Sequence, residues 1–452
     1  MSDTIAAIAT GAQTSAIGVI RISGERAIEI ADRLFLPRSK MPMSSYPDRR
    51  LIYGELRDAD GEALDLCLCT VSRAPHSYTG EDTAELQCHG SPTVLRAALD
   101  AVFASGARQA LPGEFTKRAF LNGCMDLTSA EAVADIIEAE SAEAAKNAAA
   151  QLGGAISRKT EAVYSVLSDI SAHYHAVLDY PDEDIEDFQM ENYRNVLSAA
   201  AGTLSRLYRS YDSGKLLKDG IPAVIVGRPN AGKSSLLNAL LGYDRAIVTD
   251  IPGTTRDTIE EKLRLGGVLL RLTDTAGLRS TEDRIERLGV ERSLDALARA
   301  ELAIAVIDGS APLTDEDCEL LERVKGCPRA ICVISKSDLE RKARMPELTV
   351  PAVSVSALSG EGLHELSDTV RELFPAPSEP AGEILTNARQ ADAVKRALGS
   401  LEAALDAMNC GLSPDIVLTE TETAMSALGE LSGRTVREDV TNRIFSRFCV
   451  GK

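Results

Sequence analysis

The sequence of 452 residues contains no tryptophan, and aromatic residues make up only 4% of it. It has no apolar run long enough to cross a bilayer, and its first ten residues lack the basic flank and apolar stretch of a secretory signal. Its nine cysteines are odd in number and show no paired metal-ligand spacing. We therefore expect a cytoplasmic protein with reduced thiols and no contact with a membrane.

Acidic residues outnumber basic ones by 68 to 49, and the net charge is -19. Such a charge opposes tight binding of nucleic acid by the chain alone, because the phosphates would meet a like-charged surface. If a nucleic acid is the substrate, a local basic surface or a basic partner must hold it.

The length predicts two to four domains. Residues 1–125 carry short β-branched or apolar runs, such as Ala16–Ile22 and Leu66–Val71, and are expected to form an α+β domain. Cys67 and Cys69 alternate within the second run, which places both thiols on one face of a strand and favours packing over metal binding.

Helical spacing of Ala, Glu, Leu and Ile begins at Thr128, where Thr128–Glu131 has the pattern of a capping box. Helices are expected to about residue 179 and again over 190–217. Between 220 and 375, apolar strands alternate with helices, which predicts a parallel sheet covered on both faces. The expected strands are 223–226, 268–273, 302–307, 330–334 and 352–355.

More helix follows a proline-rich link at 375–380. The expected organisation is therefore an N-terminal domain (1–125), a discontinuous helical domain (126–217 and 379–452) and an α/β domain inserted into it (218–378).

Gly227–Ser234 matches the phosphate-loop pattern and has the required strand before it and helix after it. Backbone amides of this loop can surround a β-phosphate, Lys233 can reach the β- and γ-phosphates, and the Ser234 hydroxyl can bind Mg²⁺. Asp274–Gly277 at the end of a later strand can hold the metal's water and sense the γ-phosphate. Together these motifs predict a Ras-like GTPase domain.

Ser335–Asp338 and Ser356–Leu358 are expected to recognise guanine through the Asp338 carboxylate and a backbone amide. Ser335 stands where an Asn-Lys-x-Asp motif has asparagine, and we expect its side chain to be too short to brace the loop. Thr255 is the expected switch threonine. The residues expected to contact GTP are Asn230, Ala231, Gly232, Lys233, Ser234, Ser235, Thr249, Thr254, Thr255, Asp274, Thr275, Ala276, Gly277, Lys336, Asp338, Ser356 and Ala357.

Leu278 follows the Asp-x-x-Gly motif, where Ras-like proteins carry the glutamine that orients water, so hydrolysis needs another device. Asn230 could hold a monovalent cation beside the phosphates, or it could be only a turn residue. Glu286 is a nearby carboxylate that could orient water, although spacing alone does not select it over Glu282 or Asp283.

Six further motifs are spread over the whole chain: Ser77–Asp82, Glu85–Gly90, Pro112–Asn122, Leu127–Ala134, Thr386–Arg389 and Cys449–Lys452. With the phosphate loop, they resemble the MnmE (TrmE) family of GTPases that modify the wobble uridine of tRNA. The resemblance implies an N-terminal domain that dimerises and binds 5-formyl- or methylene-tetrahydrofolate, and a GTPase activated by K⁺.

The same resemblance assigns roles to individual residues. It implies catalytic roles for Lys233, Glu286 and the thiol of Cys449. It implies K⁺ contacts at Asn230, Thr249, Ile251 and Thr254, Mg²⁺ contacts at Ser234 and Thr255, and folate contacts at Arg21, Glu85, Cys124 and Lys452, with Cys124 standing where lysine is expected in some relatives.

The implied reaction adds an aminomethyl or carboxymethylaminomethyl group to C5 of the wobble uridine (U34) of certain tRNAs. A homodimer would work with an FAD-dependent partner of the MnmG (GidA) kind in a heterotetramer or larger complex. There are two alternatives: a ribosome-assembly or signalling GTPase whose flanking domains only bind partners, and a folate-dependent transferase that acts alone. The folate motifs and Cys449 disfavour the first, and the absence of a flavin- or NAD-type Gly-x-Gly-x-x-Gly motif disfavours the second.

Overall fold

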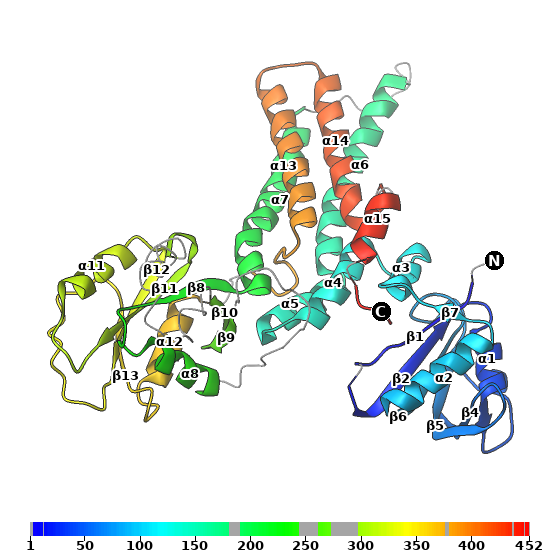
Figure 1. Ribbon diagram of the computed structural model, residues 1–452. Coiled ribbons are helices and arrows are strands. Elements are labelled where there is room, and N and C mark those ends of the chain that lie inside the picture. Colours follow the sequence, from blue (N-terminus) through cyan, green and yellow to red (C-terminus); the bar gives the residue numbers. More distant parts are fainter. Residues whose placement is uncertain are drawn as a thin grey trace. The chain divides into compact units, whose positions relative to one another are not determined.

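The computed structural model describes residues 3–11, 13–179, 190–243, 261–272, 297–375, 379–435, 438–446 and 448–451. The chain divides into two compact units, each with its own sheet (Figure 1). No helix in these ranges is long and apolar enough to span a membrane. The first unit comprises Met1–Ala134, Gln151–Gly202 and Ala393–Lys452, and the second comprises Asp135–Ala150 and Thr203–Asp392.

The first unit holds a seven-stranded sheet with the strand order β3-β4-β5-β6-β2-β1-β7. Neighbouring strands are antiparallel except β1 and β7, which are parallel. The runs predicted as strands from Ala16 and from Leu66 lie in β2 and β5, so both predictions are confirmed. The strands are β1 (Ile5–Ile8), β2 (Ser15–Ser23), β3 (Phe35–Pro37), β4 (Ile52–Arg57), β5 (Ala63–Ser72), β6 (Thr83–Gly90) and β7 (Arg108–Gln109).

Helices α1 (Ala27–Leu34) and α2 (Pro92–Ala104) cover one face of this sheet (Figure 1). Successive side chains of a strand point to opposite faces, so alternate residues of β5 enter the core beneath these helices. Cys67 and Cys69 are both buried there, as expected from their spacing. The other face of the sheet carries polar side chains and forms the pocket described below.

A buried charge cluster connects this sheet to α3 (Glu114–Leu121). Arg118, only 10% exposed, donates hydrogen bonds to the Asp3 carboxylate at 2.8 Å, to Glu81 at 3.0 Å and to Glu114 at 3.1 Å. Glu81 also accepts a 2.8 Å hydrogen bond from the Ser23 hydroxyl on β2. The guanidinium group thus joins α3, β2 and the segment that leads into β6.

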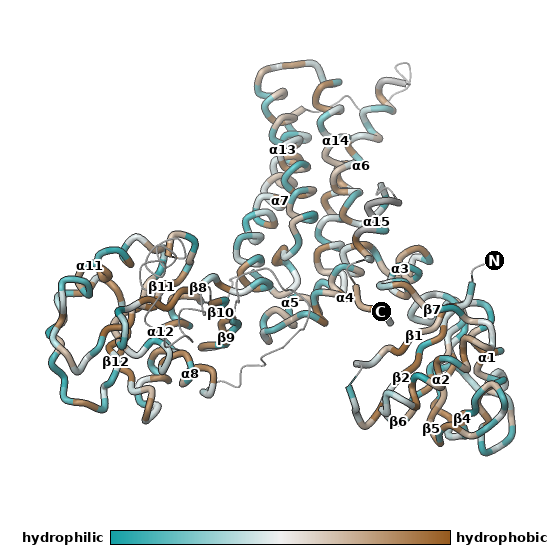
Figure 2. Tube along the Cα trace, viewed as in Figure 1, coloured by the Kyte–Doolittle hydropathy of each residue, from teal (hydrophilic) through white to brown (hydrophobic). Residues whose placement is uncertain are grey.

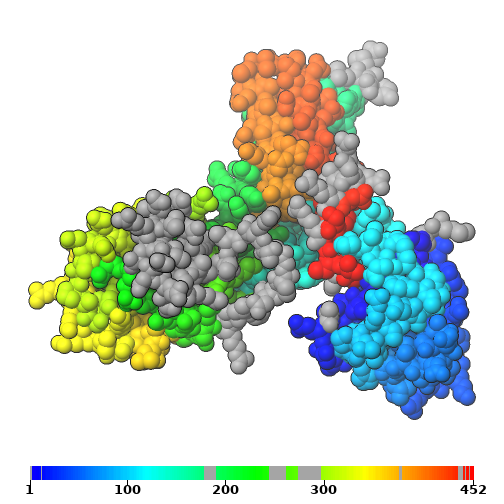
Figure 3. Space-filling view, in the orientation of Figure 1, coloured from blue at the N-terminus to red at the C-terminus, as the bar shows by residue number. Residues whose placement is uncertain are grey.

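The helical part of the first unit contains α6 (Ala155–Asp179), α14 (Pro414–Ser432) and α15 (Glu438–Phe445). α6 packs on α14, where the Tyr174 hydroxyl donates to Asp415 at 2.5 Å. The neighbouring helix α13 (Ala388–Asn409) lies beside α14 (Figure 3). The boundaries between the units fall within four of the described helices: α4 (Leu127–Glu138), α5 (Ala142–Leu152), α7 (Met190–Asp219) and α13.

The start of α4 corrects the predicted capping box at Thr128–Glu131. The helix begins one residue earlier, and Asp126 caps it by accepting hydrogen bonds from the Ser129 amide at 2.7 Å and the Thr128 hydroxyl at 2.8 Å. An aspartate immediately before the first helical residue is a better placed acceptor than Thr128, which already lies inside the helix.

The second unit holds a six-stranded sheet with the order β13-β12-β11-β8-β10-β9. Its five predicted strands are present and mutually parallel. The prediction of a wholly parallel sheet is nevertheless wrong, because a sixth strand is antiparallel. β9 pairs antiparallel with β10 through a turn in which Gly266 and Gly267 both have positive φ, a conformation that favours a tight hairpin. The strands are β8 (Ile221–Val226), β9 (Glu261–Leu265), β10 (Val268–Leu272), β11 (Leu302–Asp308), β12 (Arg329–Ser335) and β13 (Ala352–Val355).

Both faces of this sheet are covered, as predicted. Ala223 and Ile225 of β8 enter a core with α8 (Lys233–Tyr243) and α12 (Leu363–Leu373). Val224 and Val226 enter a second core with α11 (Asp315–Val324) on the opposite face. β8 and β11 are apolar along almost their whole length, as the colouring of Figure 2 shows.

The chain returns from the α/β part between α5 (Ala142–Leu152) and α7. Asn147 of α5 accepts from the Gly382 amide at 2.7 Å and donates to the Ile384 carbonyl at 3.1 Å. The Ser210 hydroxyl of α7 accepts from the Leu385 amide at 3.0 Å. These bonds satisfy the backbone of the returning segment and attach it to the second unit.

We predict that Arg118→Met destabilises the first unit by about 3–5 kcal/mol, because Glu81 would remain buried without its cation and Glu114 would keep only Arg108. Burial by itself favours neutral Glu114, but hydrogen bonds from Arg108, the Leu111 amide and Arg118 outweigh it and hold its pKa below the ordinary value. The stabilisation from Glu114 is therefore complete above its ordinary pKa and is lost as the pH falls through the lowered one.

The measurement is urea unfolding of the full chain, followed by hydrogen exchange in peptides from α3 and β1. Arg96→Met is the control, since its i,i+4 pair with Asp100 is exposed and should contribute less than about 1 kcal/mol. Equal effects of the two substitutions would contradict the prediction, as would an acid dependence that Arg118→Met leaves unchanged.

Candidate functional site

The loop between β8 and α8 has the backbone shape of a phosphate cradle. Asn230 and Gly232 both have positive φ, at 61° and 98°. At Gly227 a Cβ atom would lie 2.5 Å from the Val306 carbonyl oxygen, so only glycine fits where the loop leaves the sheet. The loop then enters α8 at Lys233, whose N-terminus attracts anions through its free amides.

The ammonium group of Lys233 lies across this loop. It donates to the carbonyl oxygens of Gly227 at 2.7 Å and Arg228 at 2.8 Å. Burial lowers the pKa of Lys233. A phosphate group beside it would favour the charged form, so the lysine is suited to pair with an anion in the loop.

Ser335, at the end of β12, contradicts the prediction that it is too short to brace the phosphate loop. Its buried hydroxyl lies 2.5 Å from the Ala231 carbonyl oxygen, to which it donates, and 3.1 Å from that of Ile307. The reach is short because the end of β12 lies close to the loop, where a Cβ built on Gly232 would be 3.4 Å from Ser335. Close approach of the strand end to the loop therefore replaces the length of an asparagine.

The expected guanine-binding residues lie together beyond this point. The Ser356 hydroxyl donates to Asp338 Oδ1 at 2.6 Å, which orients the carboxylate. Lys336 pairs with Asp308 Oδ2 at 2.6 Å. We expected one backbone amide of Ser356–Leu358 to be free to bind guanine. The Ser356 amide is not that donor, because it donates to the Glu361 carbonyl at 3.0 Å.

A second ion pair anchors the other side of the phosphate loop. Arg228 donates to Asp317 Oδ1 at 2.7 Å, and Asp317, which is 1% exposed, closes a capping box with Thr314 at the start of α11. Neither this pair nor the pairing of Asp308 with Lys336 was predicted from the sequence. No sequence signal identifies them, since an acidic residue near a helix start is ordinary.

Several predicted site residues lie outside the described residues and therefore stay predictions. They are the switch and metal-binding residues Thr249, Ile251, Thr254 and Thr255, the second switch motif Asp274, Thr275, Ala276 and Gly277, the carboxylate Glu286, and the C-terminal Lys452. Ser234, Ser235 and Ala357 are described and lie in the phosphate loop's helix and in the loop after β13.

Two of the predicted folate residues, Arg21 and Glu85, are directly paired. They are opposite each other on β2 and β6, and Arg21 Nε donates to Glu85 Oε1 at 2.9 Å. The guanidinium carbon of Arg21 is 5.2 Å from the ring centroid of Tyr78 and 5.8 Å from that of Phe115. The aromatic rings fix the arginine, whose charge in turn orients the carboxylate.

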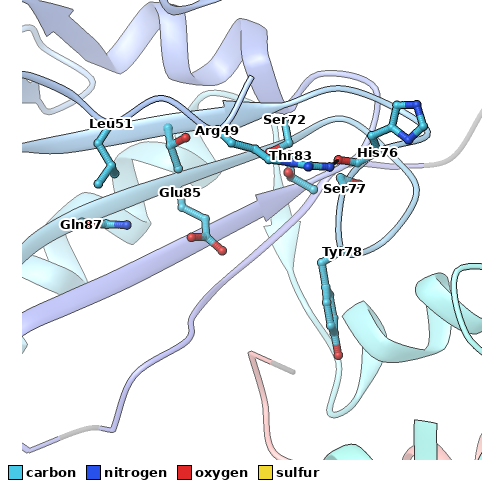
Figure 4. Close-up of a pocket in the computed structure, with 10 residues that line it drawn as sticks. Arg49, Leu51, Ser72, His76, Ser77, Tyr78, Thr83, Glu85 and Gln87 are labelled. Carbon is cyan, nitrogen blue, oxygen red and sulfur yellow. Dashed lines mark hydrogen bonds between the residues drawn. The ribbon is translucent and has the colours of Figure 1, made fainter. Parts of the chain in front are cut away.

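Glu85 also lines a cavity of about 490 Å³ on the sheet face opposite α1 and α2 (Figure 4). Thr70 is opposite Glu85 on β5, and its Oγ1 is buried with no hydrogen-bond partner among the described residues. A buried hydroxyl without a partner marks a place where a polar ligand atom can bind. The lining residues are Arg49, Leu51, Thr70, Ser72, His76, Ser77, Tyr78, Thr83, Glu85 and Gln87.

The two remaining described candidates are exposed thiols. Cys124 lies against Gly80, where an added Cβ would be 2.9 Å from its sulfur. Gly80 belongs to the same loop as Tyr78, so Cys124 borders this part of the pocket wall. The Cys449 carbonyl accepts from the Gly113 amide at 3.2 Å, which places the C-terminal motif beside the start of α3.

Comparison with known proteins agrees with these features. The family model of the "GTP-binding protein TrmE N-terminus" matches residues 4–124, and that of the "MnmE helical domain" matches residues 127–449. The chain is 40% identical over 460 residues to the tRNA modification GTPase MnmE of Alkaliphilus oremlandii (strain OhILAs), covering all of both chains. It is 44% identical over 464 residues to that of Roseiflexus sp. (strain RS-1), covering 100% of this chain and 99% of the relative.

Among solved structures, Era of Aquifex aeolicus is 28% identical, over 41% of this chain and 66% of that one, with a TM-score of 0.26. The predicted fold class is confirmed: an N-terminal α+β domain, a helical domain and a P-loop α/β domain. Because the similarity to curated relatives extends over the full length, the chain belongs to the MnmE family of tRNA modification GTPases and is a GTP hydrolase that takes part in tRNA modification.

Proposed function

We propose that the chain is a K⁺-activated GTPase that modifies C5 of the wobble uridine, U34, of certain tRNAs. It acts as a homodimer in the cytoplasm with an FAD-dependent partner of the MnmG (GidA) kind. The added group is carboxymethylaminomethyl or aminomethyl. The observation that carries the proposal is the full-length similarity to tRNA modification GTPases, together with a phosphate loop built around Asn230 and Lys233.

In the phosphate loop, Lys233 would leave its two carbonyl partners to hold the β- and γ-phosphates, and Ser234 and Thr255 would bind Mg²⁺. Asn230, with Thr249, Ile251 and Thr254, would hold K⁺ where an arginine finger places its charge in other GTPases. The exposure of Asn230 supports this role, because its side-chain oxygen is accessible to a cation. Glu286 would orient the attacking water.

Guanine would be recognised by Asp338, whose Oδ1 is already fixed by Ser356. Its second oxygen can accept hydrogen bonds from the guanine ring nitrogen and exocyclic amine. Because the Ser356 amide is bonded to Glu361, we propose that the Ala357 amide donates to the guanine oxygen. Lys336 would pack its stem along the base, since its ammonium group is held by Asp308.

The residues of the N-terminal pocket fit a tetrahydrofolate. Glu85 can accept hydrogen bonds from the donor edge of a pteridine, Thr70 offers an unused hydroxyl, and Tyr78 offers an aromatic edge. Arg21 would hold Glu85 at the pteridine end, and Lys452 would supply positive charge for a glutamyl carboxylate. Cys124 and Cys449 would border the ligand. When bound, the folate supplies the one-carbon unit, and the chain's own residues bind and orient it.

The net charge of -19 supports a division of labour with the partner. An acidic chain docks well on a basic protein, and that protein would make most of the contacts to tRNA phosphates. Hydrolysis of GTP would then move the G domain and change the folate site.

Asn230→Gly is predicted to lower GTP turnover in KCl by about 10²-fold, the usual effect of losing one transition-state contact. Glycine tolerates the positive φ, so the loop shape is kept, whereas Asn230→Ala would add backbone strain to the same loss. Turnover should be measured in KCl and in NaCl. Asn238→Ala, an exposed site on α8, is the control. If wild-type rates are equal in the two salts, the K⁺ proposal is wrong.

Ser335→Ala is predicted to weaken binding of both GTP and GDP about tenfold, because the buried Ala231 carbonyl would lose its donor and the loop its brace. Ser354→Ala, an exposed serine on β13, should leave affinity unchanged. Nucleotide affinity is measured by equilibrium fluorescence titration, and urea unfolding reports overall stability. A loss of stability with unchanged affinity would show that the serine supports only the fold.

For the modification itself, cells that lack this chain should accumulate tRNA with unmodified U34, because the proposed GTP and folate sites would be lost together. Nucleoside mass spectrometry of purified tRNA is the measurement, with the wild-type gene and Lys233→Ala as the two complementation arms. We expect restoration by the wild type only. Normal nucleosides in the deletion strain would instead favour a ribosome-assembly or signalling GTPase.

A further inference from the structure

Three metal-binding side chains meet at one end of the β5–β6 ladder. They are Asp65 and Cys67 of β5 and Cys88 of β6, and their ligand atoms all lie within 4.8 Å of one another. Leu68 pairs with Gln87, so the antiparallel register places Cys67 opposite Cys88. The period of two along β5 places Asp65 on the same face as Cys67. This arrangement depends on strand pairing and could not be read from cysteine spacing.

The carboxylate of this cluster is held in a fixed orientation. Asp65 Oδ1 accepts from the Leu66 amide at 2.8 Å and lies 2.8 Å from His89 Nδ1, while Oδ2 accepts from the His89 amide at 2.8 Å. Hydrogen bonds of this kind orient metal ligands in protein sites. The side chain of Asp65 is only 9% exposed, whereas the ring of its partner His89 is 74% exposed.

The donor set selects the class of metal. Two sulfurs and one carboxylate oxygen suit Zn²⁺ and similar ions, whereas Mg²⁺ and Ca²⁺ prefer oxygen ligands alone. Three protein ligands leave a fourth tetrahedral position for water or His89. We propose that Asp65, Cys67 and Cys88 form a binding site for a thiophilic divalent cation of the Zn²⁺ class. This site is separate from the GTP and folate sites and does not depend on the proposed function.

Cys69 shows what a merely structural thiol looks like in the same strand. It is fully buried two residues from Cys67, in the same core, and is not part of the cluster. Packing alone explains Cys69. Around Cys67 and Cys88, in contrast, the hydrogen-bonded Asp65 carboxylate adds a third ligand atom, and all three lie within 4.8 Å of one another.

The test uses the reduced, metal-stripped full chain with Zn²⁺ and with Co²⁺ as a spectroscopic substitute. The wild type and Cys69→Ser should bind about one ion per chain and show sulfur-to-cobalt charge-transfer absorption. Cys67→Ser should lose that absorption. His89→Ala should weaken Zn²⁺ affinity about 10- to 100-fold, as expected for a residue that orients a ligand. Urea unfolding of each variant, compared with that of the wild type, checks that the first unit is folded.

Cobalt absorption that is the same in Cys67→Ser and Cys69→Ser would overturn the proposal, because the ion would then be bound by exposed thiols such as Cys124 or Cys410. If Cys67→Ser does not fold, the site is tested by alkylating the thiols of the wild type in mild urea, with and without Zn²⁺. Added Zn²⁺ should slow alkylation of Cys67 and Cys88 but not of Cys69. No slowing, or equal slowing of all three thiols, overturns the site.

Discussion

The shape of the loop between β8 and α8 determines what the second unit can bind. Its amides can surround a phosphate only if the chain turns sharply, and that turn depends on glycine at 227 and 232 and on positive φ at Asn230. Such a loop would relax if nothing held it. Ser335 holds one side through the Ala231 carbonyl, and Asp317 holds the other through Arg228. Binding chemistry in this unit therefore rests on contacts outside the motif itself.

In the N-terminal sheet, side chains alternate between the two faces, and each face has its own role. Residues on one face of β5 and β6 pack beneath α1 and α2, while residues on the other face line a polar cavity. A shift of register by one residue would exchange the two sets. The Arg21–Glu85 pair and the buried charges around Arg118 both resist that shift, because each joins specific positions on different strands or helices.

Much of this architecture could be predicted from the sequence. The alternation of strands and helices, the phosphate loop and the separation into α+β, helical and α/β parts depend on local patterns. What failed were features set by tertiary contacts. The cap of α4 is Asp126 and not the predicted Thr128. The antiparallel edge strand β9, which pairs with β10 through a glycine turn, was not predicted. The partners of Arg228 and Lys336 were also missed, because nothing in the local sequence says which distant carboxylate will approach a given cation.

Ser335 shows why a motif is better interpreted as a set of donors and acceptors than as a set of residue types. An asparagine reaches the phosphate loop with a long side chain, and a serine can do so only if the backbone comes closer. Here the end of β12 provides that approach, with the hydroxyl 2.5 Å from the Ala231 carbonyl. The departure from the usual motif thus preserves the hydrogen bond to the loop, while Asp338 and Ser356 keep the carboxylate for the base.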